Sequence, residues 1–275
     1  MKNYYITSLL LAFSMLSYSQ KKNDEPVTYK DDFAFTWKKE NDSLQLIAKS
    51  KLRTVSEFII SNRETGLELN SLIVKPQDSI ILIQYKGSKP DSLFRKELMD
   101  SLNVAYYFGH KSVVHPDLDF AYRLPFKEGK KYRVSQGFKG KVSHHSKASM
   151  YAIDFQLNVG EPVYAARGGL VIKVIDWFTK QGGKELIKAA NRILILHNDG
   201  TIASYVHLDY KGSFVKEGDI VAMGDKIGVS GLTGYTRGPH LHFVVRKERD
   251  IAIPIHFDGY LNENLKQGKK YRIKQ

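Results

Sequence analysis

The chain of 275 residues contains no cysteine. The absence of thiols excludes disulfides, thiolate metal sites, a cysteine nucleophile and lipid attachment through an N-terminal cysteine. Any metal ion bound by this protein must therefore be held by histidine and carboxylate side chains. Apolar runs long enough to cross a membrane are lacking beyond the first segment, so no later membrane span is predicted.

Residues 1–19 have the composition of a secretory signal peptide. Lys2 gives a positive start, the run from Ile6 to Leu16 is mostly apolar, and Ser17 and Ser19 flank a small-x-small cleavage site. The apolar run is too short for a stop-transfer helix, so cleavage is favoured over an uncleaved anchor. We therefore expect an exported protein of the periplasm or cell envelope, with no transmembrane segment after cleavage.

The basic balance of the sequence does not point to nucleic acid. The formal net charge is +13, but the lysines and arginines are scattered through both halves, from Lys49 and Lys51 to Lys269 and Lys270. No ribonucleoprotein or helix-turn-helix signature accompanies them. A basic exported protein favours anionic partners in the cell envelope, and the charge also keeps its surface soluble.

Residues 20–120 are predicted to form an N-terminal β domain of unknown role. Short apolar or alternating segments are separated by polar turns, a punctuation typical of a β-sandwich. The expected strands lie at 32–37, 44–48, 56–60, 79–85 and 104–108, and a short helix is expected at 91–102. His110 and His115 are interpreted as structural or surface residues, and nothing else in this half indicates chemistry.

Residues 121–275 are predicted to form a second domain, again built mostly from strands. Two strands within 161–174 are separated by a Gly-Gly pair, and strands at 192–197 and 202–207 flank an Asn-Asp-Gly turn. Asp-Gly between apolar runs is a strong hairpin signal. One helical turn is expected at 184–190.

Residues 240–245 are the segment around which this second domain is interpreted. The run His-Leu-His-Phe-Val-Val is apolar or β-branched apart from its two histidines, as expected for a strand. Side chains alternate along a strand, so His240 and His242 share one face while Leu241 and Phe243 enter the core. Two imidazoles on a rigid strand can bind zinc, although two polar positions on a solvated face would give the same pattern.

A carboxylate and further histidines complete a candidate metal site. Asp154 lies in an otherwise apolar strand, where a carboxylate needs a partner and a cation is the simplest one. His144 and His145 come from a loop about ten residues earlier, and His207 ends another strand. Each of these residues alone is more often a satisfied or surface residue. Together, His144, Asp154 and His242 supply two nitrogens and one oxygen, which leaves a fourth tetrahedral position for water, as in catalytic zinc sites.

Several stretches of this half, which together span 122–257, resemble the lysostaphin-type (LytM-like) zinc metallopeptidases, exported enzymes that cut peptidoglycan peptides. The stretches occur in the order found in that family. They are Ser143-His144 with Tyr151-Ala152-Ile153-Asp154-Phe155, Gly160–Ala166, Leu196–Gly200, Tyr205–Leu208, Gly218–Gly231 and Thr233–Phe243. The resemblance implies an all-β chain whose second domain is a lysostaphin-like antiparallel β-sheet.

The resemblance also implies one zinc ion per chain, with His144, Asp154 and His242 as its ligands. It implies that His207 and His240 are catalytic residues that flank the zinc-bound water.

The first zinc ligand is the least certain of the implied residues. It stands about ten residues before Asp154 rather than four, which leaves His145 as an alternative to His144. A position directly after a glycine turn and a serine favours His144.

The implied activity is hydrolysis of peptide bonds in peptidoglycan stem or cross-bridge peptides by a monomeric endopeptidase. Zinc lowers the pKa of its water from about 15.7 toward about 7 and polarises the scissile carbonyl. No glutamate of the His-Glu-x-x-His kind is implied here, so His207 or His240 must accept the water proton. Which of the two is the general base stays open, as do the bond that is cut and the role of the first domain.

Two other functions fit parts of the sequence. The same scaffold could serve as a catalytically inactive binding or activator module of the cell envelope, which is usually marked by missing ligands, whereas every expected position is filled here. The segment 215–228 also resembles a hairpin of lipoyl and biotin carrier domains, with Lys226 at the modified position. A carrier domain gives no reason for the histidines or for Asp154.

Overall fold

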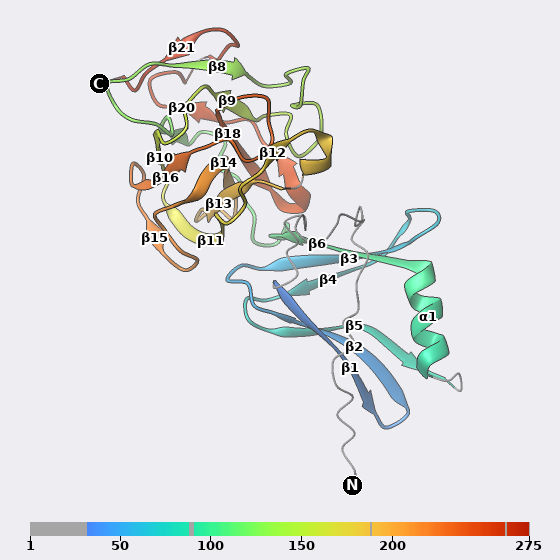
Figure 1. The fold of residues 1–275 in the computed structure, drawn as a ribbon. Helices are drawn as coiled ribbons and strands as arrows, with labels where there is room; N and C mark the ends of the chain where they lie inside the picture. Colours follow the sequence, from blue (N-terminus) through green and yellow to red (C-terminus); the bar gives the residue numbers. More distant parts are fainter. Residues whose placement is uncertain (1–31, 88–90, 188, 262, 275) are drawn as a thin grey trace. The chain divides into compact units, whose positions relative to one another are not determined.

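The computed structural model describes residues 32–274, except 88–90, 188 and 262. The predicted signal peptide at 1–19 lies outside the described residues. The chain divides into two compact units, one ending at His110 and one beginning at Lys111. The described residues form mainly strands, with one α-helix, so the all-β prediction is confirmed (Figure 1). None of the helices among the described residues has the length and apolar character needed to span a bilayer.

The first unit contains two three-stranded antiparallel sheets and helix α1 (Asp91–Ser101). One sheet has the order β1-β2-β5 and the other β4-β3-β6. The strands are β1 (Phe33–Glu40), β2 (Ser43–Ser50), β3 (Ser56–Asn62), β4 (Glu68–Val74), β5 (Ser79–Lys86) and β6 (Leu102–Phe108). Both sheets contribute to one apolar cluster, in which Phe33 and Leu46 of the first sheet pack with Phe58 and Val74 of the second. Burying a large apolar side chain of this kind contributes about 1.5–3 kcal/mol.

Strand β4 is the element of this unit that the sequence did not predict. It lies at the edge of its sheet, and only Val74 at its end is buried. Since one side of an edge strand makes no pairing and its faces here are largely exposed, its sequence carries little of the apolar alternation by which strands are recognised.

The second unit is organised around one eleven-stranded sheet. Its main path has the order β15-β11-β13-β14-β18-β9-β8-β21, and each neighbouring pair in it is antiparallel. The strands of this path are β8 (Tyr132–Gln136), β9 (Ile153–Phe155), β11 (Gly169–Ile175), β13 (Asn191–Leu196), β14 (Ile202–Ser213), β15 (Ile220–Val221), β18 (Leu241–Lys247) and β21 (Lys270–Tyr271). Three further strands join it, namely β10 (Pro162–Tyr164), β16 (Lys226–Ser230) and β19 (Ile251–Ala252).

Short elements complete the second unit. Two parallel pairs lie outside the large sheet: β7 (Ala121–Tyr122) with β20 (His256–Phe257), and β12 (Gln181–Gly182) with β17 (Gly234–Tyr235). The helical turn expected at 184–190 is a 3₁₀ turn over Lys184–Leu186, and a second covers Glu248–Asp250.

The core of the second unit lies on one face of its large sheet. Ile153 and Phe155 of β9, and Leu241 and Phe243 of β18, are almost completely buried in it. Because side chains alternate along a strand, the residues between them, Asp154 and His242 among them, face the other side of the sheet. The packing of these apolar side chains therefore decides which face carries the polar ones.

Residues 111–120, which the sequence analysis assigned to the first domain, belong to the second unit. The backbone N–H of His115 donates to the carbonyl of Asp199 over 2.7 Å, and the N–H of Asp117 donates to the Asp199 carboxylate over 3.0 Å. Arg167 lies 2.7 Å from the same carboxylate. Asp199 thus holds this segment against the turn between β13 and β14.

Candidate metal centre

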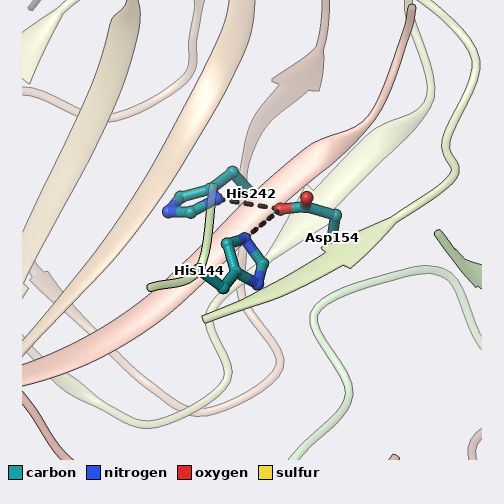
Figure 2. A group of neighbouring side chains, drawn as sticks. All are labelled: His144, Asp154 and His242. Carbon is teal, nitrogen blue, oxygen red and sulfur yellow. Dashed lines mark hydrogen bonds and ion pairs between the residues drawn. The ribbon is translucent and has the colours of Figure 1, made fainter. Parts of the chain in front are cut away.

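Strands β9 and β18 bring the first two site residues together. In their antiparallel register His242 lies directly opposite Asp154. The Nδ1 atom of His242 is 2.8 Å from the Oδ1 atom of Asp154. Figure 2 draws this contact as a dashed line. The two residues are 88 positions apart in the chain, so it is the pairing of the strands that forms this contact.

The third residue, His144, comes from the loop between β8 and β9. Its side chain is fully buried, and its Nε2 atom lies 3.2 Å from the same Oδ1 atom of Asp154. Its Nδ1 atom is 2.9 Å from the Gly137 carbonyl and must carry the proton of that hydrogen bond. In the neutral ring, Nε2 then directs its lone pair at a carboxylate oxygen, and it has no hydrogen-bond partner among the described residues. Two buried acceptors at this distance are stable only with a proton or a metal ion between them.

The donor set fits a zinc ion. Candidate ligand atoms of His144, Asp154 and His242 all lie within 4.8 Å of one another. Zinc bound tetrahedrally at 2.0–2.2 Å has ligand atoms about 3.4 Å apart, close to the separations of 2.8 and 3.2 Å from Asp154 Oδ1. Two imidazoles and one carboxylate are a combination used in catalytic zinc sites.

The pKa values of the three candidate ligands are shifted by burial and by their contacts with one another. Burial tends to raise the pKa of Asp154, but its contacts with His144 and His242 outweigh burial and hold this pKa well below its ordinary value. Burial lowers the pKa of His242. Burial also tends to lower the pKa of His144, but Asp154 outweighs it and raises this pKa. A proton on His144 therefore occupies the position that a metal ion would take, and the two compete.

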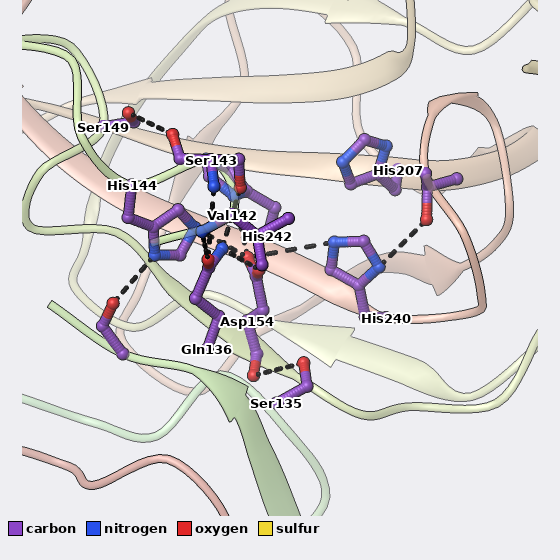
Figure 3. Close-up of polar contacts among 12 residues, drawn as sticks. Ser135, Gln136, Val142, Ser143, His144, Ser149, Asp154, His207, His240 and His242 are labelled. Atoms are coloured by element: carbon purple, nitrogen blue, oxygen red, sulfur yellow. Dashed lines mark hydrogen bonds and ion pairs between the residues drawn. The ribbon is translucent and has the colours of Figure 1, made fainter. Parts of the chain in front are cut away.

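Gln136, at the end of β8, ties the His144 loop to the carboxylate. Its Nε2 atom donates to Asp154 Oδ2 over 3.1 Å and to Ser143 Oγ over 2.7 Å. Its Oε1 atom accepts from the backbone N–H groups of Val142 and Ser143 at 2.9 and 3.2 Å. Figure 3 shows this side chain between Asp154 and the loop. Gln136 was not predicted from the sequence, where its one signal is a polar residue at a position that continues the alternation of Tyr132 and Val134.

His207 lies next to the metal centre, at a point of backbone strain. Its φ of 65° is in the left-handed region, which is uncommon for a residue other than glycine. Strand β14 pairs with β18 up to Val206 and with β16 from Leu208, so His207 stands where the strand changes partner. Its Nδ1–H donates to the Thr233 carbonyl over 2.7 Å, which leaves Nε2 as the free nitrogen. Burial lowers the pKa of His207 to about 3, so the ring is neutral.

His240 completes the group of imidazoles. Its ring centroid is 4.6 Å from that of His207, and its Nε2 atom is 3.8 Å from Asp154 Oδ1. Its Nδ1–H donates to the Gly238 carbonyl over 2.9 Å. His207 and His240 thus each direct one ring nitrogen to a backbone carbonyl. Figure 3 shows the two rings beside one another, with the contact between His240 and Asp154 as a dashed line.

The structure thus brings together all five residues that the sequence analysis singled out, listed as His144, Asp154, His207, His240 and His242. His145, the alternative first ligand, is exposed. His197 lies outside the group: it is buried, and its Nδ1–H donates to Thr201 over 2.9 Å.

Asn191 braces the segment behind His207. Its backbone N–H donates to the Thr233 hydroxyl over 3.0 Å, and that hydroxyl donates to the Leu208 carbonyl over 2.8 Å. The Thr233 carbonyl is the acceptor for His207. Thr233 therefore links strands β13 and β14 around one imidazole, and this role was not predicted from the sequence.

Part of the second unit matches a known protein family. Residues 148–254 match Peptidase family M23. This segment is an M23 peptidase domain. The M23 domain contains Asp154, His207, His240 and His242, whereas His144 precedes the matched residues. The family match therefore does not include His144, and its place in the metal centre is supported by its contact with Asp154.

Relatives of the M23 domain include metallopeptidases of known and unknown role. An uncharacterized metalloprotease of Buchnera aphidicola is 32% identical over 208 residues, which are 68% of this chain and 51% of the relative. The peptidoglycan DD-endopeptidase ShyB of Vibrio cholerae is 36% identical over 120 residues, 42% of this chain and 26% of the relative. The chain therefore spans about half the length of the first relative and about a quarter of the second.

A solved structure is also similar to the M23 domain. The catalytic domain of lysostaphin from Staphylococcus simulans is 32% identical to this chain over the matched residues. The match covers 46% of this chain and 87% of the lysostaphin domain, with a TM-score of 0.33.

Proposed function

We propose that the protein is an exported zinc metalloendopeptidase that hydrolyses peptide bonds in peptidoglycan stem or cross-bridge peptides. The observation that carries this proposal is the convergence of ligand atoms from His144, Asp154 and His242 beside two further imidazoles. The M23 domain, and its similarity to a peptidoglycan DD-endopeptidase, support a peptide of the cell wall as the substrate.

His144, Asp154 and His242 would hold one zinc ion per chain. With three ligands from the protein, a fourth position is left for water, as in zinc enzymes rather than in structural zinc sites. A bound ion would supply Lewis acidity, which lowers the pKa of its water toward about 7 and polarises a peptide carbonyl. Gln136 keeps the loop of His144 and the carboxylate of Asp154 in place by binding both.

His207 and His240 would move the protons of the reaction. Each directs its Nδ1 proton to a backbone carbonyl, so in the neutral ring Nε2 is the atom that can accept a proton. The ring that accepts a proton from water becomes a cation, and it can donate that proton to the leaving amine. The second ring, if it takes up a proton from solvent, can stabilise negative charge on the carbonyl oxygen. In the absence of a glutamate base, these two imidazoles are the acid–base groups of this proposal.

Release of fragments from purified sacculi tests the proposed activity. Full-length protein loaded with one equivalent of zinc is incubated with sacculi, and soluble products are analysed by mass spectrometry with and without a chelator. We expect products whose termini report a cleaved peptide bond, loss of these products with the chelator, and recovery when zinc is restored. Intact sacculi in the presence of the zinc-loaded protein would contradict the proposal and favour an inactive binding module.

Export and a monomeric state are part of the same proposal. The composition of residues 1–19 supports a cleaved signal. Cell fractionation with N-terminal sequencing should recover the protein outside the cytoplasm with a new terminus near residue 20. Light scattering should give the mass of a single processed chain.

A further inference from the structure

A pocket of about 390 Å³ lies between the strand ends that follow β8 and precede β21. One wall is the turn from Gly137 to Gly140, which continues β8, and the facing wall is the segment 264–267, which leads into β21. Tyr151 and Pro254 also line it. The whole pocket belongs to the second unit.

The lining of this pocket is both apolar and cationic. Phe138 and Tyr151 stand edge to face with their ring centroids 5.4 Å apart, and Leu265 adds a further apolar contact. Lys139 and Lys266 provide two positive charges, and none of the described lining residues is acidic. A ligand of this pocket must therefore combine apolar groups with negative charge.

Further cations lie on or beside the two strands that adjoin the pocket walls in sequence. Arg133 on β8 pairs directly with Lys270 on β21, and Lys269 precedes it. Like charges directly opposite one another in a ladder are destabilising. Within the described part of the chain, no carboxylate forms an ion pair with Arg133, Lys269 or Lys270. An anion bound at this edge of the sheet would offset the repulsion.

The pocket shares a wall with the metal centre. The carbonyl of Gly137 accepts the Nδ1 proton of His144, and Gly137 and Gly140 both line the pocket. The turn is held firmly, since Lys139 N–H donates to the Met150 carbonyl over 2.7 Å and His144 N–H to the Gly140 carbonyl over 3.0 Å. A ligand in the pocket is thus separated from the histidine by one turn of backbone.

We propose that this pocket binds a carboxylate of the substrate peptide, with Lys139 and Lys266 as its cationic partners and Phe138 and Tyr151 as its apolar wall. This inference rests on the proposed function for the identity of the peptide. The apolar walls favour a peptide over an inorganic polyanion, because a polyanion would leave the aromatic rings without a partner. Lys139 and Lys266 are then specificity-determining residues outside the metal centre.

Calorimetric titration of the zinc-free full-length protein measures this binding without cleavage. The probes are a peptidoglycan stem pentapeptide with free carboxylates, the same peptide with every carboxyl group amidated, and inorganic polyphosphate. We expect the free acid to bind more tightly than the amide, and Lys139→Gln and Lys266→Gln each to weaken binding of the free acid by about 1.4- to 5-fold, the range of one exposed charge pair. Both substitutions should leave the weaker affinity for the amide unchanged.

Lys216→Gln is the matched control, because Lys216 is exposed and precedes β15, at the opposite end of the sheet from β21. Equal affinities for acid and amide, or equal losses in the control, would overturn the proposal. Lysine-dependent binding of polyphosphate with no binding of either peptide would overturn it in favour of a polyanion. Lysine-dependent peptide binding together with intact sacculi would refute the proposed activity and leave the pocket assignment standing.

Discussion

Gln136 and Asp154 are joined by a hydrogen bond of 3.1 Å, and this contact binds the carboxylate of the metal centre to the loop that carries His144. Replacing Gln136 with methionine keeps the volume of the side chain but removes its hydrogen bonds to Asp154 and to Ser143. We expect the affinity for zinc to fall about 10- to 100-fold, the usual effect of losing a group that orients a metal ligand. Competition with a chromogenic chelator measures this affinity directly.

Gln156→Met is the control for this substitution, since Gln156 is exposed and directly follows β9. Zinc affinity in the control should match that of the unmodified chain. If Gln136→Met binds zinc as tightly as the control, the His144 loop is held by other contacts and the positioning role is wrong.

Neighbouring histidines should differ sharply in their effect on metal content. His144 is buried beside Asp154, whereas His145 is exposed. His144→Ala should reduce bound zinc from one equivalent to well below half after dialysis, measured by elemental analysis, while His145→Ala should retain one equivalent. The reverse pattern would make His145 the ligand and would require the loop to rearrange on binding.

His207 and His240 should separate metal binding from turnover. Both lie beside the metal centre, but the ligand atoms that converge there come from His144, Asp154 and His242, so neither is a ligand in our proposal. Alanine at either position should keep one zinc per chain and lower the rate of fragment release by about 10²- to 10⁴-fold, the range of general acid–base groups. Loss of zinc in either variant would show that the residue is a ligand instead.

Stability in acid should depend on His197. Burial, followed by repulsion from Arg167, lowers the pKa of His197 to about 3 from an ordinary value of 6.5. The unfolded chain therefore binds a proton below pH 6.5 that the folded chain does not accept until about pH 3, so stability falls as the pH falls through this window. Between pH 7.5 and 4 the loss from this residue is on the order of 3 kcal/mol.

His197→Asn removes the titrating group while an amide can still donate to Thr201. Chemical denaturation of the zinc-free protein across this pH range should give a shallower loss of stability in the variant. Parallel curves for the two proteins would mean that His197 is accessible to protons in the folded state.

Much of the metal centre was predictable because it lies on strands. The alternation around Asp154 and around His242 assigns each residue to the face opposite the core, and the structure has both strands side by side. His144 was harder to assign, because a loop residue has no periodicity and a second histidine follows it. Its burial beside Asp154 separates it from His145.

Gln136 and Thr233 were not predictable in the same way. Each acts through hydrogen bonds to groups between 6 and 42 residues away, and such partners are known only once the chain is folded. The left-handed backbone of His207 had no signal either, because glycine and asparagine are the residues that usually adopt it. The edge strand β4 escaped prediction because its side chains are mostly exposed.

The register between β9 and β18 determines both the packing of the core and the position of the metal ligands. Sliding one strand past the other by a single residue would swap its two faces, so that Asp154 entered the apolar layer and Ile153 or Phe155 took its place among the imidazoles. Such a slip would expose aromatic surface as well as dismantle the ligand cluster. Mutations that loosen the aromatic layer under Phe243 should therefore appear first as errors in metal loading, long before the domain unfolds.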